Sequence, residues 1–275
     1  MSKNLKEIEI DCLLRAVSER YGYDFHNYAR ASLTRRVDYC LMQSDCEHIS
    51  ELIPKVLHDS DYLSEFIGNM SVTVTEMFRD PTMFKCVRED IVPILRTYSR
   101  INIWHAGCAT GQEVYSMAIL LQEEGLLDRA RLYATDFDRH SLKIAKEGIY
   151  PAESFDLYSK NYLQAGGKAS LANYFQENYQ RVKIKESIKE KIIFADHNLT
   201  CDQVFAEMHL VICRNVLIYF DKELQNRALN LFSESLLARG FLILGDKETI
   251  KFSQIKDGFE ALSEELKIYR KIRHV

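Results

Sequence analysis

The segment from Ile103 to Tyr115, IWHAGCATGQEVY, constrains the fold more than any other part of this 275-residue chain. An apolar run that reads as a strand leads directly into a turn of small residues, and the turn opens a helix. Gly107, Ala109 and Gly111 carry little or no side chain where a backbone has to approach a ligand closely. The first N–H groups of the helix have no partner within it and point toward the same place. This unit predicts an α/β fold with a ligand beyond the end of the strand.

The spacing of the small residues separates two classes of nucleotide-like cofactor. A dinucleotide pattern, G-x-G-x-x-G, would need glycine at Gln112 so that helix and strand could pack closely under a pyrophosphate. The shorter rhythm G-x-G-x-G is met at 107, 109 and 111 with one substitution and is typical of S-adenosylmethionine binding. A plain strand-to-helix turn remains the alternative for this motif taken alone. A second predicted strand, 131–135, ends in Asp136, where an acid commonly binds the two hydroxyl groups of a ribose.

Composition excludes several classes of protein. The chain is 47% hydrophobic and 28% charged, which is ordinary for a globular protein, and its formal net charge of −4 gives no reason to expect nucleic-acid binding. Seven cysteines occur without a CxxC pair or a Cys/His cluster, which argues against a metal and for a reducing compartment. The amino terminus has no apolar signal core, and Arg214 interrupts the longest apolar run. We expect a cytoplasmic protein that does not insert into a membrane.

The first seventy residues read as a small helical bundle, with predicted helices at 5–17, 26–42, 50–57 and 62–67. Beyond residue 100 the pattern changes to strands that alternate with helices, which predicts a mostly parallel sheet. The expected strands are 101–106, 131–135, 192–195, 209–213 and 240–244, and the helices lie near 82–98, 112–122, 141–147 and 222–238.

We therefore expect an α/β, Rossmann-like fold with an N-terminal all-helical domain at 1–70. A linker at 71–100 would cover the cofactor, and the cofactor-binding domain would occupy 101–275. The stretch at about 150–190 is long for a crossover between strands. We interpret it as a small inserted β-subdomain, because Gln180 to Lys185 is β-like.

Ligands of an open α/β sheet lie beyond the carboxyl ends of its strands. Strand 192–195 continues into Asn198, and strand 210–213 continues into Asn215. Each asparagine supplies an amide donor and acceptor suited to an adenine edge or an amino-acid head group. The segment 73–79 precedes the first strand and could fold across the same edge.

In five blocks the chain resembles the chemotaxis methyltransferases, which methylate glutamates on chemoreceptors. The blocks are SVTVTEMFRDPTMF (71–84), WHAGCATGQEVYSMAI (104–119), ATDFDRHSLKIAKEGIY (134–150), DHNL (196–199) and CRNVLIYFD (213–221). The resemblance covers nearly the whole chain and implies the same helical domain, cofactor domain and inserted β-subdomain. By motif position it places around S-adenosylmethionine the residues Thr73, Thr75, Arg79, Glu113, Asp136, Asn198, Leu199, Asn215 and Val216.

The chain departs from the family pattern at three places. The family often has asparagine at the position of Thr73 and a second acid at that of Gln112. Members that bind a receptor's C-terminal tail peptide have a glycine-containing loop before the strand that corresponds to 180–185. The chain reads FQENYQ at 175–180, without glycine. We therefore expect an enzyme that does not depend on tail-peptide tethering.

Methylation of a glutamate requires alignment more than acid–base chemistry, because a carboxyl group of pKa about 4.3 is already ionised at neutral pH. Arg79 is the catalytic candidate for steering that carboxylate, since its planar fork suits a planar anion. Alternatively, Arg79 holds the carboxylate of the cofactor. Tyr219 is a second candidate on the substrate side. His105 and His197 are more simply read as hydrogen-bonded strand-end residues, and Asp138 as a helix cap.

The helix at 26–42 carries Arg30, Arg35 and Arg36 without an acid between Tyr28 and Val37. Such a basic helix could dock the glutamate-bearing helical bundle of a chemoreceptor by charge complementarity. A solvated helix face is the alternative.

Together these observations predict a protein-glutamate O-methyltransferase that uses S-adenosylmethionine and releases S-adenosylhomocysteine. We expect a monomer that is recruited to membrane-bound receptor arrays. The alternatives are a methyltransferase for another substrate and a non-catalytic signalling adaptor that binds S-adenosylmethionine.

Overall fold

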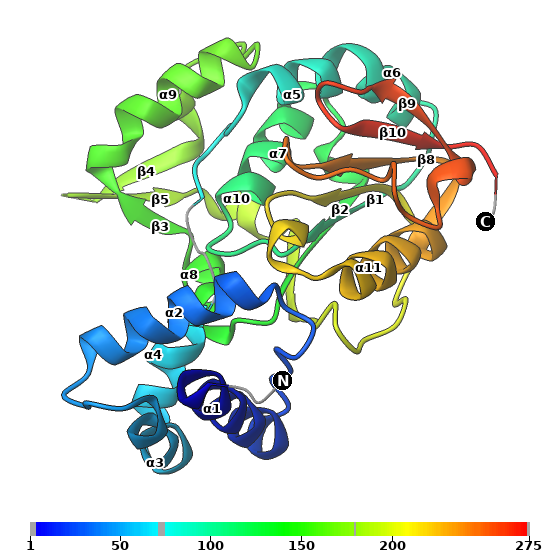
Figure 1. The fold of residues 1–275 in the computed structure, drawn as a ribbon. Coiled ribbons are helices and arrows are strands. Elements are labelled where there is room, and N and C mark those ends of the chain that lie inside the picture. The colour runs from blue at the N-terminus through cyan, green and yellow to red at the C-terminus, as the bar shows by residue number, and fades with distance from the viewer. Residues whose placement is uncertain (1–3, 71–74, 179, 274–275) are drawn as a thin grey trace. The chain divides into compact units, whose positions relative to one another are not determined.

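The computed structural model describes residues 4–70, 75–178 and 180–273 (Figure 1). Contacts divide the chain into two compact units. The first consists of residues 1–72 and 219–227, and the second of residues 73–218 and 228–275.

The first unit is built on four α-helices, α1 (Leu5–Tyr21), α2 (Arg30–Gln43), α3 (Leu52–His58) and α4 (Ser60–Met70), with a 3₁₀ turn at Ile49–Glu51. Asn4 caps α1 in a capping box with Glu7, and Gly22 ends the helix in the left-handed conformation. The apolar faces of the helices form a common core. Its fully buried members include Leu13, Val17, Val37, Leu52, Val56 and Phe66.

A segment from far along the chain, 219–227, completes this helical unit. The Ala29 N–H donates to the Tyr219 carbonyl at 2.8 Å. Tyr28 forms an antiparallel bridge with Phe220, and their rings pack edge to face with centroids 5.0 Å apart. The helical unit therefore contains Tyr219, which lies close in sequence to the strand-end motif at 213–216.

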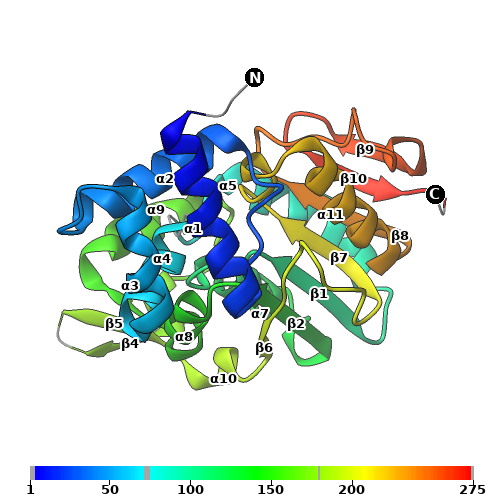
Figure 2. The same cartoon turned by 60° about the horizontal axis from the view of Figure 1, so that its bottom comes forward.

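The second unit is organised around a seven-stranded sheet within the described residues, in the order β6-β2-β1-β7-β8-β10-β9. Five neighbouring strands run parallel, and β10 pairs antiparallel with both β8 and β9. Figure 2 shows β6, β2, β1 and β7 side by side. The strands are β1 (Ile101–Ala106), β2 (Ala130–Asp136), β6 (Ile192–Asp196), β7 (Met208–Cys213), β8 (Leu236–Leu244), β9 (Phe259–Ser263) and β10 (Ile268–Lys271).

Helices bury the sheet on its two faces, and for this reason its central strands are almost continuously apolar. Helix α7 (Gln112–Glu123) buries nine of its residues, from Gln112 through Leu121. Trp104 in β1 is fully buried, and its ring N–H donates to Thr135 Oγ1 at 2.8 Å, so that no polar atom of the indole is left unpaired. The other helices are α5 (Pro81–Cys86), a π-helical turn (Val87–Ile91), α6 (Val92–Leu95) and α8 (Arg139–Glu147). Helix α11 (Lys222–Ser235) begins in the helical unit and belongs to the second unit from residue 228 on.

The crossover between α8 and β6 holds a small antiparallel sheet in the order β3-β5-β4. Its strands are β3 (Ile149–Pro151), β4 (Phe175–Asn178) and β5 (Arg181–Ile184), and the crossover also contains α9 (Phe155–Gln164) and α10 (Glu186–Lys189). The fold class predicted from the sequence is confirmed: a mostly parallel sheet with helices, an N-terminal helical unit and a small inserted β-sheet.

The structure departs locally from the predictions, most clearly in the following elements. The helix predicted at 222–238 ends at Ser235, because Leu236 begins β8 and pairs with Met208 of β7. The helix predicted at 82–98 is interrupted by the π-helical turn at Val87–Ile91. The antiparallel strands β9 and β10 were not predicted, because strands of only five and four residues carry a weak alternating pattern.

Candidate functional site

The carboxyl ends of β6, β2, β1 and β7 meet along one edge of the sheet, because these four strands are parallel neighbours. Four of the predicted site residues lie at the ends of these strands or within two residues after them. Asn198 follows β6, Asp136 ends β2, Gly107 follows β1 and Asn215 follows β7. The topology thus brings together residues that lie up to 108 positions apart in the sequence.

The turn between β1 and α7 adopts backbone conformations that small residues favour. Gly107, Ala109 and Gly111 have φ values of 73°, 48° and 93°. A Cβ atom added to Gly107 would collide with the side chain of Val216, so glycine permits β1 and the segment after β7 to approach each other. The N–H of Gly107 also donates to the Thr135 carbonyl at 2.8 Å, which ties the turn to β2.

Asp136 links this turn to the start of α8. Its carboxylate accepts the Ala109 N–H at 2.8 Å and the Asp138 N–H at 2.9 Å. Burial raises the pKa of Asp136 to about 6, although these backbone hydrogen bonds act in the opposite direction. Asp138 caps α8 by accepting the His140 N–H at 2.9 Å, so the capping role expected from the sequence belongs to Asp138 and not to Asp136.

Glu113 stands in the first turn of α7 at the centre of a buried ionic cluster. Its carboxylate lies 3.1 Å from His105 Nδ1 and 3.1 Å from Arg214 Nη1. The Arg214 guanidinium also pairs with Asp80. Burial acts to raise the pKa of Glu113, but the His105 hydrogen bond and the Arg214 charge outweigh it and hold the pKa below its ordinary value. Glu113 is therefore a carboxylate at neutral pH.

The same arginine holds the segment that precedes α5. Arg214 Nη1 donates to the Arg79 carbonyl at 3.3 Å, and the Phe78 N–H donates to Ser116 Oγ at 2.8 Å. Phe78 and Asp80, on either side of Arg79, have positive φ values of 52° and 55°. Non-glycine residues in this conformation are strained and persist where the surroundings hold them, often at functional sites. Thr75 is half-buried in this segment, and Thr73 lies outside the described residues.

Sequence reasoning missed Glu248, which supports the segment after β7. Its buried carboxylate accepts the N–H groups of Asn215 at 3.2 Å, Ile218 at 3.3 Å and Gly245 at 2.6 Å. Burial raises the pKa of Glu248 despite these three donors. Asn215 is held with a φ of 61°. The only trace in the sequence is the spacing GDKE at 245–248, and nothing in it identifies a partner 33 residues upstream.

Asn198 and Leu199 form a tight turn after β6. The Asn198 side chain accepts the Thr200 N–H at 3.0 Å, and the Asn198 N–H donates to Asp202 at 2.8 Å. Leu199 is buried. His197 is also buried; its ring packs against Trp104, and its Nε2 lies 3.2 Å from the Gln203 carbonyl. These contacts fit the simpler expectation for His197, a hydrogen-bonded residue at a strand end.

Two buried nitrogen atoms of the ionic cluster have no hydrogen-bond partner among the described residues. They are His105 Nε2 and Arg214 Nε. Unpaired buried polar atoms are rare in folded proteins and suit a place where a polar ligand binds. Cys108 follows Gly107 in the chain and Cys213 precedes Arg214, and both side chains are buried. Burial raises the pKa of each thiol well above its ordinary value, so neither cysteine is a thiolate nucleophile at neutral pH.

The predicted substrate-side residues occur together in the helical unit. The Arg36 guanidinium lies over the Tyr219 ring, 5.0 Å from its centroid, and donates to the Asn69 carbonyl at 3.1 Å. Arg30 pairs with Asp11 of α1 at 2.6 Å. Arg35 is exposed and has no ion pair within the described part of the chain. The three arginines of α2 therefore differ: two are held by neighbours, and Arg35 projects into solvent.

The donor set at the sheet edge suits S-adenosylmethionine. The carboxylate of Glu113 can pair with an ammonium group, and the remaining lone pairs of Asp136 can accept ribose hydroxyls. The amide of Asn215 could bind either end of the same molecule. When bound, S-adenosylmethionine supplies an electrophilic methyl group on its sulfonium. Among residues 4–70, 75–178 and 180–273 no cluster of three His, Cys, Asp or Glu side chains could hold a metal ion.

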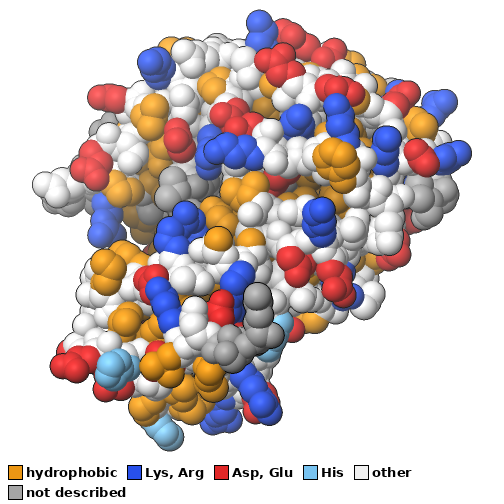
Figure 3. Space-filling view, viewed as in Figure 1, with side chains coloured by type: hydrophobic (Ala, Val, Ile, Leu, Met, Phe, Trp, Pro, Cys, Tyr) orange, Lys and Arg blue, Asp and Glu red, His pale blue; other side chains and the backbone are white. Residues whose placement is uncertain are grey.

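Two features of the wider surface bear on possible partners. No helix in the described ranges is long and apolar enough to cross a bilayer. Figure 3 shows Lys and Arg side chains interspersed with Asp and Glu over the face that it draws, in keeping with a formal net charge of −4.

Two family models match the chain. Residues 73–268 match "CheR methyltransferase, SAM binding domain", and residues 8–71 match "CheR methyltransferase, all-alpha domain". The first match contains every predicted cofactor-binding residue, and the second contains the three arginines of α2.

Relatives along nearly the whole chain agree with these matches. A protein of Pseudomonas putida, provisionally named methyltransferase Cher3, is 49% identical over 98% of this chain and 99% of its own length. Proteins named chemotaxis protein methyltransferase are 29% identical in Borreliella burgdorferi, over 90% of both chains, and 27% identical in Listeria monocytogenes, over 90% of this chain and 92% of the relative.

Proposed function

The chain belongs to the CheR methyltransferase family and is an S-adenosylmethionine-dependent methyltransferase, and from this premise we propose that its substrates are glutamate side chains of chemoreceptors. The observation that carries the proposal is the sheet edge that presents Glu113, Asp136 and Asn215. Arg214 connects this edge to the segment of Arg79, because it pairs with Glu113 and donates to the Arg79 carbonyl. The names of the Borreliella and Listeria relatives support an output in chemotaxis.

The chemistry at this edge fits an acceptor that needs no deprotonation. A glutamate of pKa about 4.3 is ionised at neutral pH, and attack on a sulfonium methyl neutralises charge. The thiols of Cys108 and Cys213 are held protonated. The carboxylates of Glu113, Asp136 and Glu248 already accept hydrogen bonds from backbone or arginine donors, so none is free to act as a general base on the acceptor. The protein's contribution would therefore be alignment and exclusion of water from the acceptor carboxylate.

We propose that Arg79 orients the acceptor carboxylate. Its backbone is fixed by the Arg214 contact and by the strained residues on both sides, so its side chain starts from a defined position. A guanidinium fork can hold a carboxylate in one plane without removing all of its nucleophilicity. Arg79 could alternatively bind the carboxylate of S-adenosylmethionine, and measuring both methyl transfer and S-adenosylhomocysteine binding in Arg79→Ala separates the two roles.

We propose that Tyr219 and α2 meet the receptor. The Arg36 guanidinium stacks on the ring of Tyr219. Tyr219, which we expect near the acceptor glutamate, therefore contacts Arg36, which we expect to dock the receptor. Arg35 is exposed on the same helix and is available to acidic side chains of a helical bundle. We further propose that the enzyme acts on receptor arrays without tail-peptide tethering, because the segment before β5 lacks the glycine of tail-binding members.

Transfer of labelled methyl from S-adenosylmethionine to receptor-containing membranes tests the proposal. We expect label in the receptor band as a base-labile ester, to the same extent with receptors that lack their C-terminal tail. Label that survives base, or label on a small molecule alone, would contradict glutamate as the acceptor.

Arg79→Ala sharpens the assignment of that residue. Loss of acceptor alignment should lower kcat by about a hundredfold while S-adenosylhomocysteine binds within about twofold of wild type. Arg100→Ala, at an exposed position before β1, is the matched control. If calorimetry instead finds that Arg79→Ala weakens S-adenosylhomocysteine binding as much as it slows transfer, Arg79 holds the cofactor and not the acceptor.

Charge reversal at Arg35 tests the docking surface. Arg35→Glu should lower kcat/KM for receptor membranes by about threefold to tenfold at low salt, and raising the salt should shrink that difference. S-adenosylhomocysteine binding should not change. An equal loss of receptor methylation and cofactor binding would indicate a folding defect and contradict docking by this residue.

A further inference from the structure

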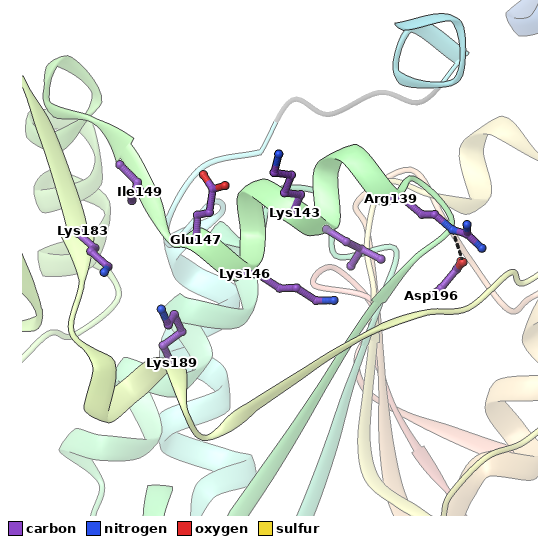
Figure 4. A pocket seen from close by; sticks show the side chains of 9 residues that line it. Arg139, Lys143, Lys146, Glu147, Ile149, Lys183, Lys189 and Asp196 are labelled. Carbon is purple, nitrogen blue, oxygen red and sulfur yellow. Dashed lines mark hydrogen bonds and ion pairs between the residues drawn. The ribbon is translucent and has the colours of Figure 1, made fainter. Parts of the chain in front are cut away.

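A basic groove opens beside α8, within the second unit, and none of the predicted site residues lines it. Its volume is about 740 Å³. Residues from α8, β3, β5, α10 and the end of β6 line it, so the groove lies between the inserted β-sheet and the parallel sheet. Figure 4 shows Lys183 and Lys189 facing each other from β5 and α10, with Lys146 extending from α8 beyond them.

The lining carries an excess of positive charge. Five cations, Arg139, Lys143, Lys146, Lys183 and Lys189, face only two acids. Arg139 pairs with Asp196 at 2.8 Å, and Lys189 pairs with Glu186 at 2.9 Å. The other three lysines have no ion pair among the described residues. A chain of net charge −4 thus concentrates uncompensated positive charge in one concave place, which attracts an anion.

The chemistry of the lining favours a polypeptide over a nucleotide. None of the nine lining side chains is aromatic, so a base would find no ring on which to stack. The ammonium groups project from exposed or half-buried lysines and offer adaptable point charges, not a rigid phosphate cradle. Leu142 and Ile149 supply apolar floor for the aliphatic part of acidic side chains.

We propose that this groove binds an acidic segment of the receptor that is methylated, as a second docking surface in addition to α2. The proposal rests on the proposed function, since a substrate methylated on glutamates presents several carboxylates along one helix. Contacts of this exposed kind mainly accelerate association and depend on salt. The groove would therefore raise the rate of productive encounter without taking part in methyl transfer.

The test compares two double charge reversals. Lys143→Glu with Lys146→Glu changes the exposed rim of the groove on α8, and Arg100→Glu with Lys256→Glu is the control, with the same change of net charge at exposed positions outside the groove. Circular dichroism and calorimetry with S-adenosylhomocysteine report on folding and on the cofactor site. We measure kcat/KM for receptor membranes and co-sedimentation with them across a range of salt.

We expect the groove variant to lose about tenfold in kcat/KM at low salt, with a flatter salt dependence and with cofactor affinity within about twofold of wild type. The variant Lys143→Gln with Lys146→Gln should lose less. Equal kinetics in the groove and control variants would overturn the proposal while leaving the proposed function intact. If wild type binds and methylates no receptor, the proposed function fails and this proposal fails with it.

A further control asks whether the anionic partner of the groove is a receptor segment or the lipid surface of the membrane. Co-sedimentation with receptor-free vesicles of phosphatidylglycerol and phosphatidylcholine distinguishes a receptor segment from a lipid surface. Binding to these vesicles that the groove variant loses would assign the groove to lipid and overturn the receptor assignment. Vesicle binding that is absent, or equal in both variants, supports it.

Discussion

Helix α7 carries an arginine–glutamate cluster at each end, and the two clusters differ in how completely their polar atoms are paired and in the backbone that they hold. At the amino end, Glu113 pairs with Arg214, which also holds Asp80 and the Arg79 carbonyl. This cluster leaves His105 Nε2 and Arg214 Nε without hydrogen-bond partners among the described residues. The cluster also contacts the segment in which Phe78 and Asp80 have strained backbone conformations, and these two nitrogen atoms remain available to a ligand.

At the carboxyl end, Glu123 is surrounded by donors. Its carboxylate accepts the hydroxyls of Tyr162 and Tyr174, the Lys168 N–H at 3.0 Å and the guanidinium of Arg88. Burial acts to raise the pKa of Glu123, but these hydrogen bonds outweigh it and lower the pKa. The cluster ties α9 and the segment after it to α7.

The comparison separates two uses of the same chemistry. A satisfied cluster holds a subdomain in place, whereas a cluster with spare polar atoms beside strained residues is suited to a ligand. We therefore expect changes at the amino end to alter cofactor binding and transfer, and changes at the carboxyl end to alter stability alone.

The largest effect is expected at Arg214. Arg214→Met removes the cation that pairs with Glu113 and leaves that carboxylate with only its His105 contact, which should destabilise the fold by about 3–5 kcal/mol. Because the Arg79 segment also loses its support, kcat of the remaining folded protein should fall by about a hundredfold. Urea unfolding and single-turnover methyl transfer check the two parts.

Arg214→Lys provides the matched control for that prediction. It keeps the charge but not the planar fork, so it should recover much of the stability and little of the rate. If Arg214→Lys transfers methyl at the wild-type rate, the contacts of Arg214 with Asp80 and with the Arg79 carbonyl do not position the site. The two ends of α7 would then not differ in their effect on catalysis.

A smaller effect is expected at the opposite end of α7. Glu123→Gln keeps the shape but removes the charge that Arg88 and the two tyrosine hydroxyls bind, which should cost about 2–3 kcal/mol in urea unfolding. Glu260→Gln, on an exposed position of β9, should change stability by less than about 0.5 kcal/mol. A large loss of kcat at a temperature where Glu123→Gln is fully folded would remove the contrast.

The smallest effect concerns pH. Because burial raises the pKa of Asp136 to about 6, this group stabilises the fold below its unfolded pKa, and that contribution is lost as pH rises through 6. Ribose hydroxyls would favour the ionised form, so S-adenosylhomocysteine affinity should rise by about tenfold between about pH 5 and pH 7. Asp136→Asn should flatten this profile. A wild-type profile without slope would contradict ribose binding by Asp136.

The sequence was informative where structure depends on neighbours in the chain. The turn at Gly107, the cap at Asp138 and the strand ends at Asn198 and Asn215 follow from local patterns, and the sheet order then brings them to one edge. The resemblance to the chemotaxis methyltransferases added the role expected of Glu113. Whether these residues bind the cofactor in the predicted roles stays a prediction.

What the sequence could not show depends on distant partners. Glu248 supports Asn215 across 33 positions, and Glu123 meets Tyr174 across 51. No local periodicity identifies such pairs. The same reason explains why Tyr219 could be named as a candidate but not placed against Arg36, which precedes it by 183 positions.

Calorimetric titration of S-adenosylhomocysteine into wild type, Glu113→Gln and Glu123→Gln tests the central claim most directly. The two variants make the same chemical change at the two ends of one helix. We predict that Glu113→Gln weakens binding by at least about tenfold, since it removes a charge-assisted partner of the ligand, while Glu123→Gln stays within about twofold of wild type. Equal affinities in the two variants, or a greater loss in Glu123→Gln, would contradict a cofactor site at the amino end of α7.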